Sequence, residues 1–215
     1  MNKLNFMAAA AVAVIAAGCG NDVKPVIPRD AEIEKKVEAT LSRMSLDEKI
    51  GQMTQITINA VAEKSADGNS YTLNEEKLSM FIDKYKVGSF LNTPTEKALP
   101  AAEWNRLVKI VNAKSLEVMG IPTIYGLDHI HGTTYISDGT FFPQPIAVAA
   151  TFNREIARRA GEITAYESRA ADVPWSFNPT LDSGRDPRWS RFWENYGEDW
   201  YVNAEMGKAT ILGEQ

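Results

Sequence analysis

The residue types best suited to chemistry lie near the C-terminal end of the chain, in residues 184–199 (GRDPRWSRFWENYGED). Three arginines, four aromatic side chains and four acidic side chains share these sixteen residues. The stretch follows the apolar run 173–177, so we expect a loop at the carboxyl end of a strand. In α/β proteins this is where catalytic and ligand-binding residues lie. Arginine forks bind hydroxyls, and indole rings offer flat apolar faces. This composition favours a sugar over a phosphate, which requires a glycine-rich loop; a salt-bridged surface loop is the alternative interpretation.

A second candidate site is the segment 125–132 (YGLDHIHG), which ends another apolar run. If both runs are strands of one parallel sheet, Asp128 lies at the same carboxyl end of that sheet as the 185–191 loop, and the two face one site. A carboxylate there accepts hydrogen bonds from two adjacent sugar hydroxyls, while an arginine donates to the same ring. The alternative for Asp128 is a cap on the following turn.

The chain has two histidines, His129 and His131, and both lie close to Asp128 in the sequence. A metal-dependent hydrolase using these three residues is a minor alternative, because ligands are few and no HExxH helix is present. We expect no metal and no cofactor. For His131, a role in orienting the loop is at least as well supported as contact with substrate.

Composition narrows the class of protein and its compartment. A formal net charge of −5 argues against a nucleic-acid partner. Lys3, the apolar run 6–17 and Cys19, the only cysteine, resemble a lipoprotein signal covering residues 1–18. A lipid on Cys19, a tether over 19–29 and export to the periplasm or outer membrane of a bacterium follow as expectations. An ordinary secretory signal is the alternative.

The remaining pattern alternates strands with helices from residue 30 onward. Apolar runs predict strands at 53–58, 87–91, 123–127 and 173–177, and helical periodicity covers 101–119, 153–170 and 200–212. Ser45 with Glu48, and Thr72 with Glu75, are typical of capping boxes that open two further helices. The order predicts an α/β fold with a parallel sheet. It is either a small open sheet or the N-terminal half of a (β/α)8 barrel of about 250 residues, truncated at Gln215; the missing closing element favours the half barrel.

Taken together, these segments resemble the N-terminal part of glycoside hydrolase family 3, of the β-glucosidase type. The resemblance spans about residues 44–213, and its motifs occur in the family's order: IGQM at 50–53, VGS at 87–89, GIPTIYG at 120–126, Asp128, His131 with Gly132, FP at 142–143, and residues 185–199. The resemblance implies that residues 30–215 form part of the family's barrel domain.

The resemblance also implies roles for individual residues. It implies that Asp128 and Arg191 bind hydroxyls of the terminal sugar. Beside them, the spacing of three residues lets Glu194 hold Arg191 by a charge-assisted bond, and we expect Arg185 and His131 to support the loop. Family members carry a Lys-His pair and an aspartate nucleophile beyond this arginine, and an acid/base glutamate in a second domain, and none of these is matched here. We therefore expect both catalytic carboxylates beyond Gln215, and a chain that is inactive alone. The implied parent reaction is retaining hydrolysis of terminal β-glucosyl or similar residues; a non-catalytic carbohydrate-binding protein is the alternative.

Overall fold

The computed structural model describes residues 28–215, and the chain divides into two compact units, Met1–Met44 and Ser45–Gln215. The predicted signal, Cys19 and most of the predicted tether lie outside the described residues. No helix within residues 28–215 has the length and apolar character needed to cross a membrane.

The described part of the first unit is helix α2 (Ala31–Leu41). Asp30 caps the helix, because its carboxylate accepts from the backbone N–H groups of Glu32 and Ile33. Ile33, Val37 and Leu41 are all exposed and recur every four residues, so they form one apolar stripe along the helix.

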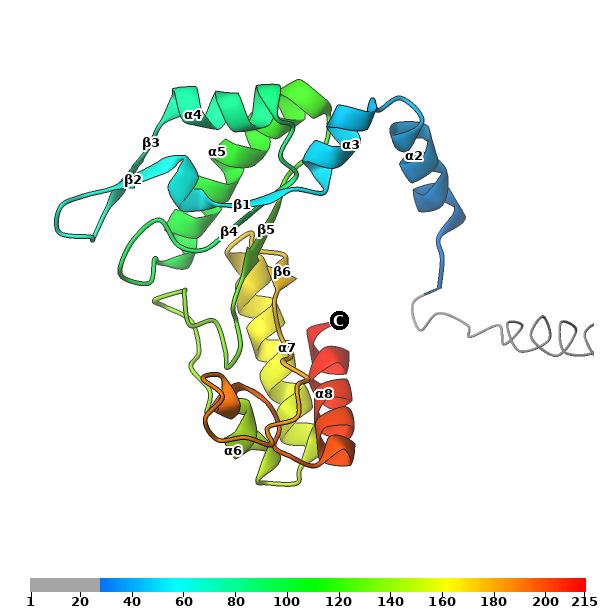
Figure 1. Cartoon of the computed structure of the whole chain (residues 1–215), viewed down its shortest axis with the longest axis vertical. Coiled ribbons are helices and arrows are strands. Elements are labelled where there is room, and N and C mark those ends of the chain that lie inside the picture. Colours follow the sequence, from blue (N-terminus) through cyan, green and yellow to red (C-terminus); the bar gives the residue numbers. More distant parts are fainter. Residues whose placement is uncertain (1–27) are drawn as a thin grey trace, which may run out of the picture. The chain divides into compact units, whose positions relative to one another are not determined.

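The second unit is built on a four-stranded parallel sheet with the order β1-β4-β5-β6 (Figure 1). The strands are β1 (Gln55–Thr57), β4 (Ser89–Leu91), β5 (Ile124–Leu127) and β6 (Trp175–Ser176). Each one falls within a predicted run, and helices separate consecutive strands, as a parallel sheet requires. The α/β fold with its barrel-like alternation is confirmed. β6 begins directly after Pro174, which has no backbone N–H to donate to the sheet.

Helices connect and cover the strands. They are α3 (Leu46–Gln52), α4 (Glu75–Ser79) continued by the π-helical turn η2 (Met80–Lys84), α5 (Ala101–Met119), α6 (Pro145–Ala149), α7 (Arg154–Ala170) and α8 (Trp200–Glu214), with 3₁₀ turns η1 (Ile58–Ala60) and η3 (Phe192–Glu194). The predicted Ser45/Glu48 capping box is present. Helices α7 and α8 lie side by side (Figure 1), and Gly161 and Gly213 permit this approach because a Cβ on either would collide with the backbone of the other helix.

The core fills the space between the sheet and the helices. Ile56, Phe90 and Tyr125 share one row of the sheet, and the Tyr125 ring meets the buried Trp104 of α5 edge-on at 5.4 Å. The next row places Gly126 beside Trp175 on the opposite face of the sheet. That face is open in the second unit: Ile124 and Trp175 remain 50% and 41% exposed. The Phe177 ring packs against Gly126 on this face, which is therefore only partly covered.

An antiparallel hairpin that the sequence pattern did not predict follows β1. Its strands are β2 (Ala62–Lys64) and β3 (Tyr71–Leu73). The predicted Thr72/Glu75 capping pair is therefore wrong. Residue 72 belongs to β3, and Asn74 caps α4 by accepting from the Lys77 backbone N–H. A three-residue strand is too short for alternation to be visible in sequence.

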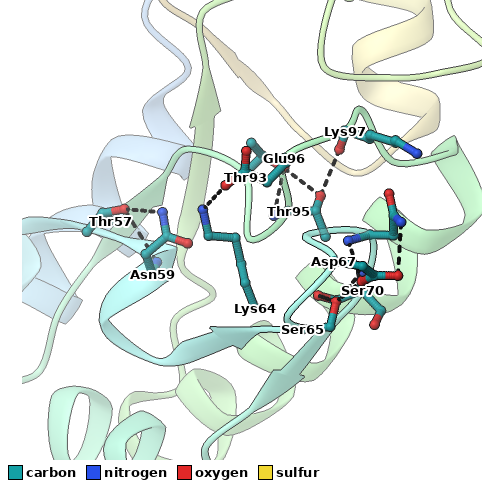
Figure 2. Close-up of polar contacts among 11 residues, drawn as sticks. Thr57, Asn59, Lys64, Ser65, Asp67, Ser70, Thr93, Thr95, Glu96 and Lys97 are labelled. Carbon is teal, nitrogen blue, oxygen red and sulfur yellow. Dashed lines mark hydrogen bonds and ion pairs between the residues drawn. The ribbon is translucent and has the colours of Figure 1, made fainter.

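Side-chain and backbone bonds fix the hairpin to the loop after β4 (Figure 2). Lys64 forms an ion pair with Glu96 at 2.8 Å. The Glu96 backbone N–H also donates to the Gly68 carbonyl at 2.9 Å. Within the tip, Asp67 accepts from the Ser65 hydroxyl and from Asn69, which together lower the pKa of Asp67 to about 2. Because the hairpin starts at the carboxyl end of β1, it stands at the same end of the sheet as the loops described next.

Candidate sugar-binding site at the carboxyl ends of the strands

Asp128 lies directly after β5, at the carboxyl end of the sheet. It borders a polar cavity of about 320 Å³. The cavity is lined by residues of the loops that follow β5 and β6: Asp128, Ile130, His131, Thr134, Tyr135, Gln144, Arg191 and Glu194. The structure thus brings together four of the residues singled out by sequence, namely Asp128, His131, Arg191 and Glu194.

Arg191 is held in the cavity by an ion pair with Glu194. Arg191 Nε donates to Glu194 Oε2 at 2.7 Å, and Arg191 Nη2 forms an ion pair with the same oxygen at 2.6 Å. The spacing of three residues predicted this bond. η3 begins at Phe192 and so carries Glu194 back toward the arginine. Among residues 28–215 no acceptor meets Arg191 Nη1, so this edge of the guanidinium is free for a ligand.

The two acids of the cavity differ in their surroundings. Burial raises the pKa of Asp128, the positive charge of Arg191 opposes this effect, and the negative charge of Glu194 adds to it. The Asp128 carboxylate therefore gains from any ligand that donates hydrogen bonds, because donors stabilise its charged form. Glu194 already has its counter-ion in Arg191.

The loop after β5 is fixed to two helices. Glu167 of α7 accepts from the Thr133 hydroxyl at 2.7 Å, the Thr140 backbone N–H at 2.7 Å and the Thr140 hydroxyl at 2.6 Å. Toward α5, the Trp104 indole donates to the Tyr135 carbonyl at 2.7 Å, and Asp138 accepts from the Ala101 backbone N–H at 2.8 Å. The cavity wall formed by Thr134 and Tyr135 is therefore rigid. Asp138 serves as a structural anchor of the loop.

The two histidines play different parts. The His131 ring borders the cavity, and its Nδ1 lies 2.8 Å from the Phe142 carbonyl, which requires a proton on Nδ1 and leaves Nε2 as an acceptor. His129 is fully buried, and neither ring nitrogen has a hydrogen-bond partner within the described chain. No three His, Cys, Asp or Glu side chains of residues 28–215 gather to hold a metal ion. The metal-dependent alternative thus has no site in this part of the chain.

Some residues singled out by sequence lie outside the cavity lining. Arg185 is exposed, and its backbone N–H donates to the Ser183 carbonyl within its own loop. Arg188 pairs with Asp186 on the surface. Sequence reasoning in turn missed Tyr135 and Gln144. Neither stands in a motif, and they reach the cavity only because the loop 130–144 folds back across the end of β5.

Comparison with known proteins agrees with this architecture. Residues 45–215 match the model of the glycosyl hydrolase family 3 N terminal domain. The chain is 38% identical to the lysosomal beta glucosidase of Dictyostelium discoideum and 29% identical to the periplasmic beta-glucosidase of Salmonella typhimurium, over 83% and 81% of its own length. It spans about a fifth of the length of these relatives, 22% and 20%.

Solved structures give the same result. The exo-1,3/1,4-beta-glucanase of a Pseudoalteromonas species superimposes with a TM-score of 0.73 at 28% identity, over 87% of this chain and 23% of that one. A mutant beta-glucosidase of Listeria innocua in complex with laminaribiose superimposes with a TM-score of 0.62 at 31% identity, over 84% of this chain and 23% of that one. On the family match and these similarities, the chain belongs to glycosyl hydrolase family 3.

Proposed function

We propose that this chain supplies a sugar-binding part of a β-glucosidase-type glycoside hydrolase, and that Asp128 and Arg191 bind the terminal sugar of a β-glucoside or related oligosaccharide. The observation that carries the proposal is their position on one polar cavity at the carboxyl end of a parallel sheet, the active end of barrel enzymes.

The chemistry of the cavity supports a neutral polyhydroxylated ligand. Asp128, Glu194 and His131 Nε2 offer acceptors, and the free edge of Arg191 offers donors. A sugar carries both donors and acceptors on neighbouring carbons, so one ring engages both kinds of group. The solved Listeria innocua enzyme in complex with glucose, 30% identical to this chain, points to the same ligand class.

The proposal assigns neither catalytic carboxylate to residues 1–215. Retaining glycosidases place a nucleophile and an acid/base group about 5 Å apart, on either side of the scissile bond. Of the two acids on the cavity, Glu194 is bound to Arg191, and Asp128 is the group proposed to hold hydroxyls. The resemblance to family 3 enzymes supports this assignment, because the motifs that carry both carboxylates in the family are not matched in residues 1–215.

The test is a substitution in the full-length protein encoded by the natural gene. Asp128→Asn removes the charge but keeps the shape, and we expect at least a hundredfold loss of kcat/KM on p-nitrophenyl β-D-glucoside, because a charge-assisted pair is lost in a partly buried site. Asp47→Asn, on the exposed face of α3, is the matched control and leaves kcat/KM unchanged.

Two other outcomes separate the alternatives. If the full-length protein binds glucose but turns over no β-glucoside, the protein is a carbohydrate-binding protein without hydrolase activity. Equal activity of Asp128→Asn and the unaltered protein would remove Asp128 from the site.

We further propose that residues 1–18 are a signal segment and that Cys19 carries lipid, which would anchor an exported protein to a membrane. Periplasmic relatives support export. The intact mass of the membrane-extracted protein tests this: we expect an acylated N-terminal Cys19, and a mature terminus elsewhere with a free thiol would contradict it.

A further inference from the structure

Tyr135 brings an unbonded phenol to the cavity of Asp128 and Arg191. The side chain lines this cavity and is half-buried. Its hydroxyl has no hydrogen-bond partner among residues 28–215, and it is not one of the buried unpaired atoms in this part of the chain, so solvent reaches it. A tyrosine hydroxyl both donates and accepts hydrogen bonds. The group is therefore available to an occupant of the cavity.

The backbone and the ring of Tyr135 are held in place. Its carbonyl accepts from the Trp104 indole at 2.7 Å and from the Leu99 backbone N–H at 3.2 Å. The ring packs against the main hydrophobic core of the second unit. A phenol fixed in this way loses little conformational freedom when a ligand binds to it.

The two acids of the cavity lie close enough to act on this phenol. Burial raises the pKa of Tyr135, and the negative charges of Asp128 and Glu194 raise it further. The hydroxyl therefore keeps its proton at neutral pH. Because this proton is bonded to no group of the described chain, the phenol is a free donor beside two carboxylate acceptors.

A donor beside Asp128 suits a ligand hydroxyl better than either group alone. A sugar hydroxyl that donates its proton to the Asp128 carboxylate keeps lone pairs on its oxygen, and these accept a proton from a neighbouring donor. Arg191 uses Nε and Nη2 on Glu194, which leaves few donors on this side of the cavity. The Tyr135 hydroxyl supplies one.

We infer that Tyr135 is a specificity-determining residue of this site, whose phenol hydroxyl forms a hydrogen bond with one hydroxyl of the sugar held by Asp128 and Arg191. This inference rests on the proposed function. It adds an uncharged group to the charged pair. Such a bond discriminates between a hydroxyl and a hydrogen at one ring position, because only the hydroxyl pairs with the phenol.

The experiment measures glucose binding by calorimetry in the full-length protein, comparing the unaltered protein with Tyr135→Phe. Phenylalanine keeps the ring and its packing and removes only the hydroxyl. We expect the Kd for glucose to rise about fivefold, the loss typical of one hydrogen bond between uncharged groups. The melting temperature should stay the same, whereas loss of a hydroxyl bonded within the protein would lower it.

Tyr166→Phe is the matched control. Tyr166 lies on α7, is largely exposed and is outside the cavity lining, so this variant loses the same atom at a distance from the site. We expect it to bind glucose like the unaltered protein.

A panel of the monodeoxy glucoses then identifies the sugar hydroxyl. In the unaltered protein, the deoxy sugar lacking that hydroxyl binds more weakly than glucose. In Tyr135→Phe this difference shrinks, since the phenol and the sugar hydroxyl are coupled. The other deoxy sugars keep their differences from glucose in both proteins.

The inference is overturned if Tyr135→Phe binds glucose normally, or if it weakens glucose and every deoxy sugar by the same factor. Asp128→Asn keeps this failure apart from failure of the proposed function. Loss of glucose binding in Asp128→Asn alone retains the sugar site and rejects Tyr135. Normal binding in both variants rejects both.

Discussion

At the scale of single residues, neighbouring positions in the loop after β5 have opposite environments. Asp128 borders a polar cavity, whereas His129 is fully buried beside it, with both ring nitrogens unpaired in the described chain. Burial lowers the pKa of His129 to about 4, an effect that the negative charge of Glu167 only partly opposes. The imidazole is thus neutral in the folded protein at neutral pH.

A pH-dependent stability follows from His129. In the unfolded chain its pKa returns to the ordinary value of about 6.5, so the unfolded state binds more protons between about pH 6.5 and 4. The free energy of unfolding should therefore fall as the pH drops through this window, by up to roughly 3 kcal/mol from this group, since one pKa unit corresponds to about 1.4 kcal/mol. Below about pH 4 the contribution levels off.

Urea denaturation of the full-length protein, from neutral pH down through this window, measures the effect. His129→Phe fills a similar space and cannot titrate, so its stability should fall less steeply with acid than that of the unaltered protein. Carboxyl groups titrate equally in both proteins, and the difference between the two curves isolates His129. Parallel curves would contradict the assignment.

At the scale of elements, the site depends on long helices holding a long loop. One carboxylate of α7, Glu167, gathers three donors from the loop 133–140, while α5 engages the same loop through Trp104 and the Ala101 backbone N–H. The strands themselves contribute no residue to the cavity lining. Precision in the site therefore comes from tertiary bonds between the loop and the helices behind it.

The same distinction explains what the sequence could predict. The four parallel strands and the helices α5, α7 and α8 lie where apolar runs and helical periodicity predicted them. Asp128 with Arg191 follows from the rule that parallel strands end at one edge. The hairpin β2–β3, the cap at Asn74 and the approach of Gln144 do not follow, since they rest on contacts between residues far apart in the chain.

At the scale of the whole molecule, the second unit is a sheet with helices on one face. Neither β1 nor β6 has a strand partner on its outer side within the described residues. The uncovered face carries Ile124 and Trp175, and Leu46 and Met53 of the adjoining N-terminal segment are also largely exposed. Exposed strand edges and apolar patches favour association over a monomeric state.

We therefore expect residues 28–215, produced alone, to be marginally stable and inactive. Two open edges and one partly uncovered face leave apolar surface in water, and the proposed function places neither a nucleophile nor an acid/base group within the chain. Light scattering and a thermal melt should show concentration-dependent association and a broad transition, and a chromogenic β-glucoside should not be hydrolysed above background. The full-length protein, assayed beside it, provides the positive control.

A sharp cooperative melt of a monomer would show that the sheet needs no further cover. Turnover by the chain alone that Asp128→Asn abolishes would mean that the cavity already holds a complete active site.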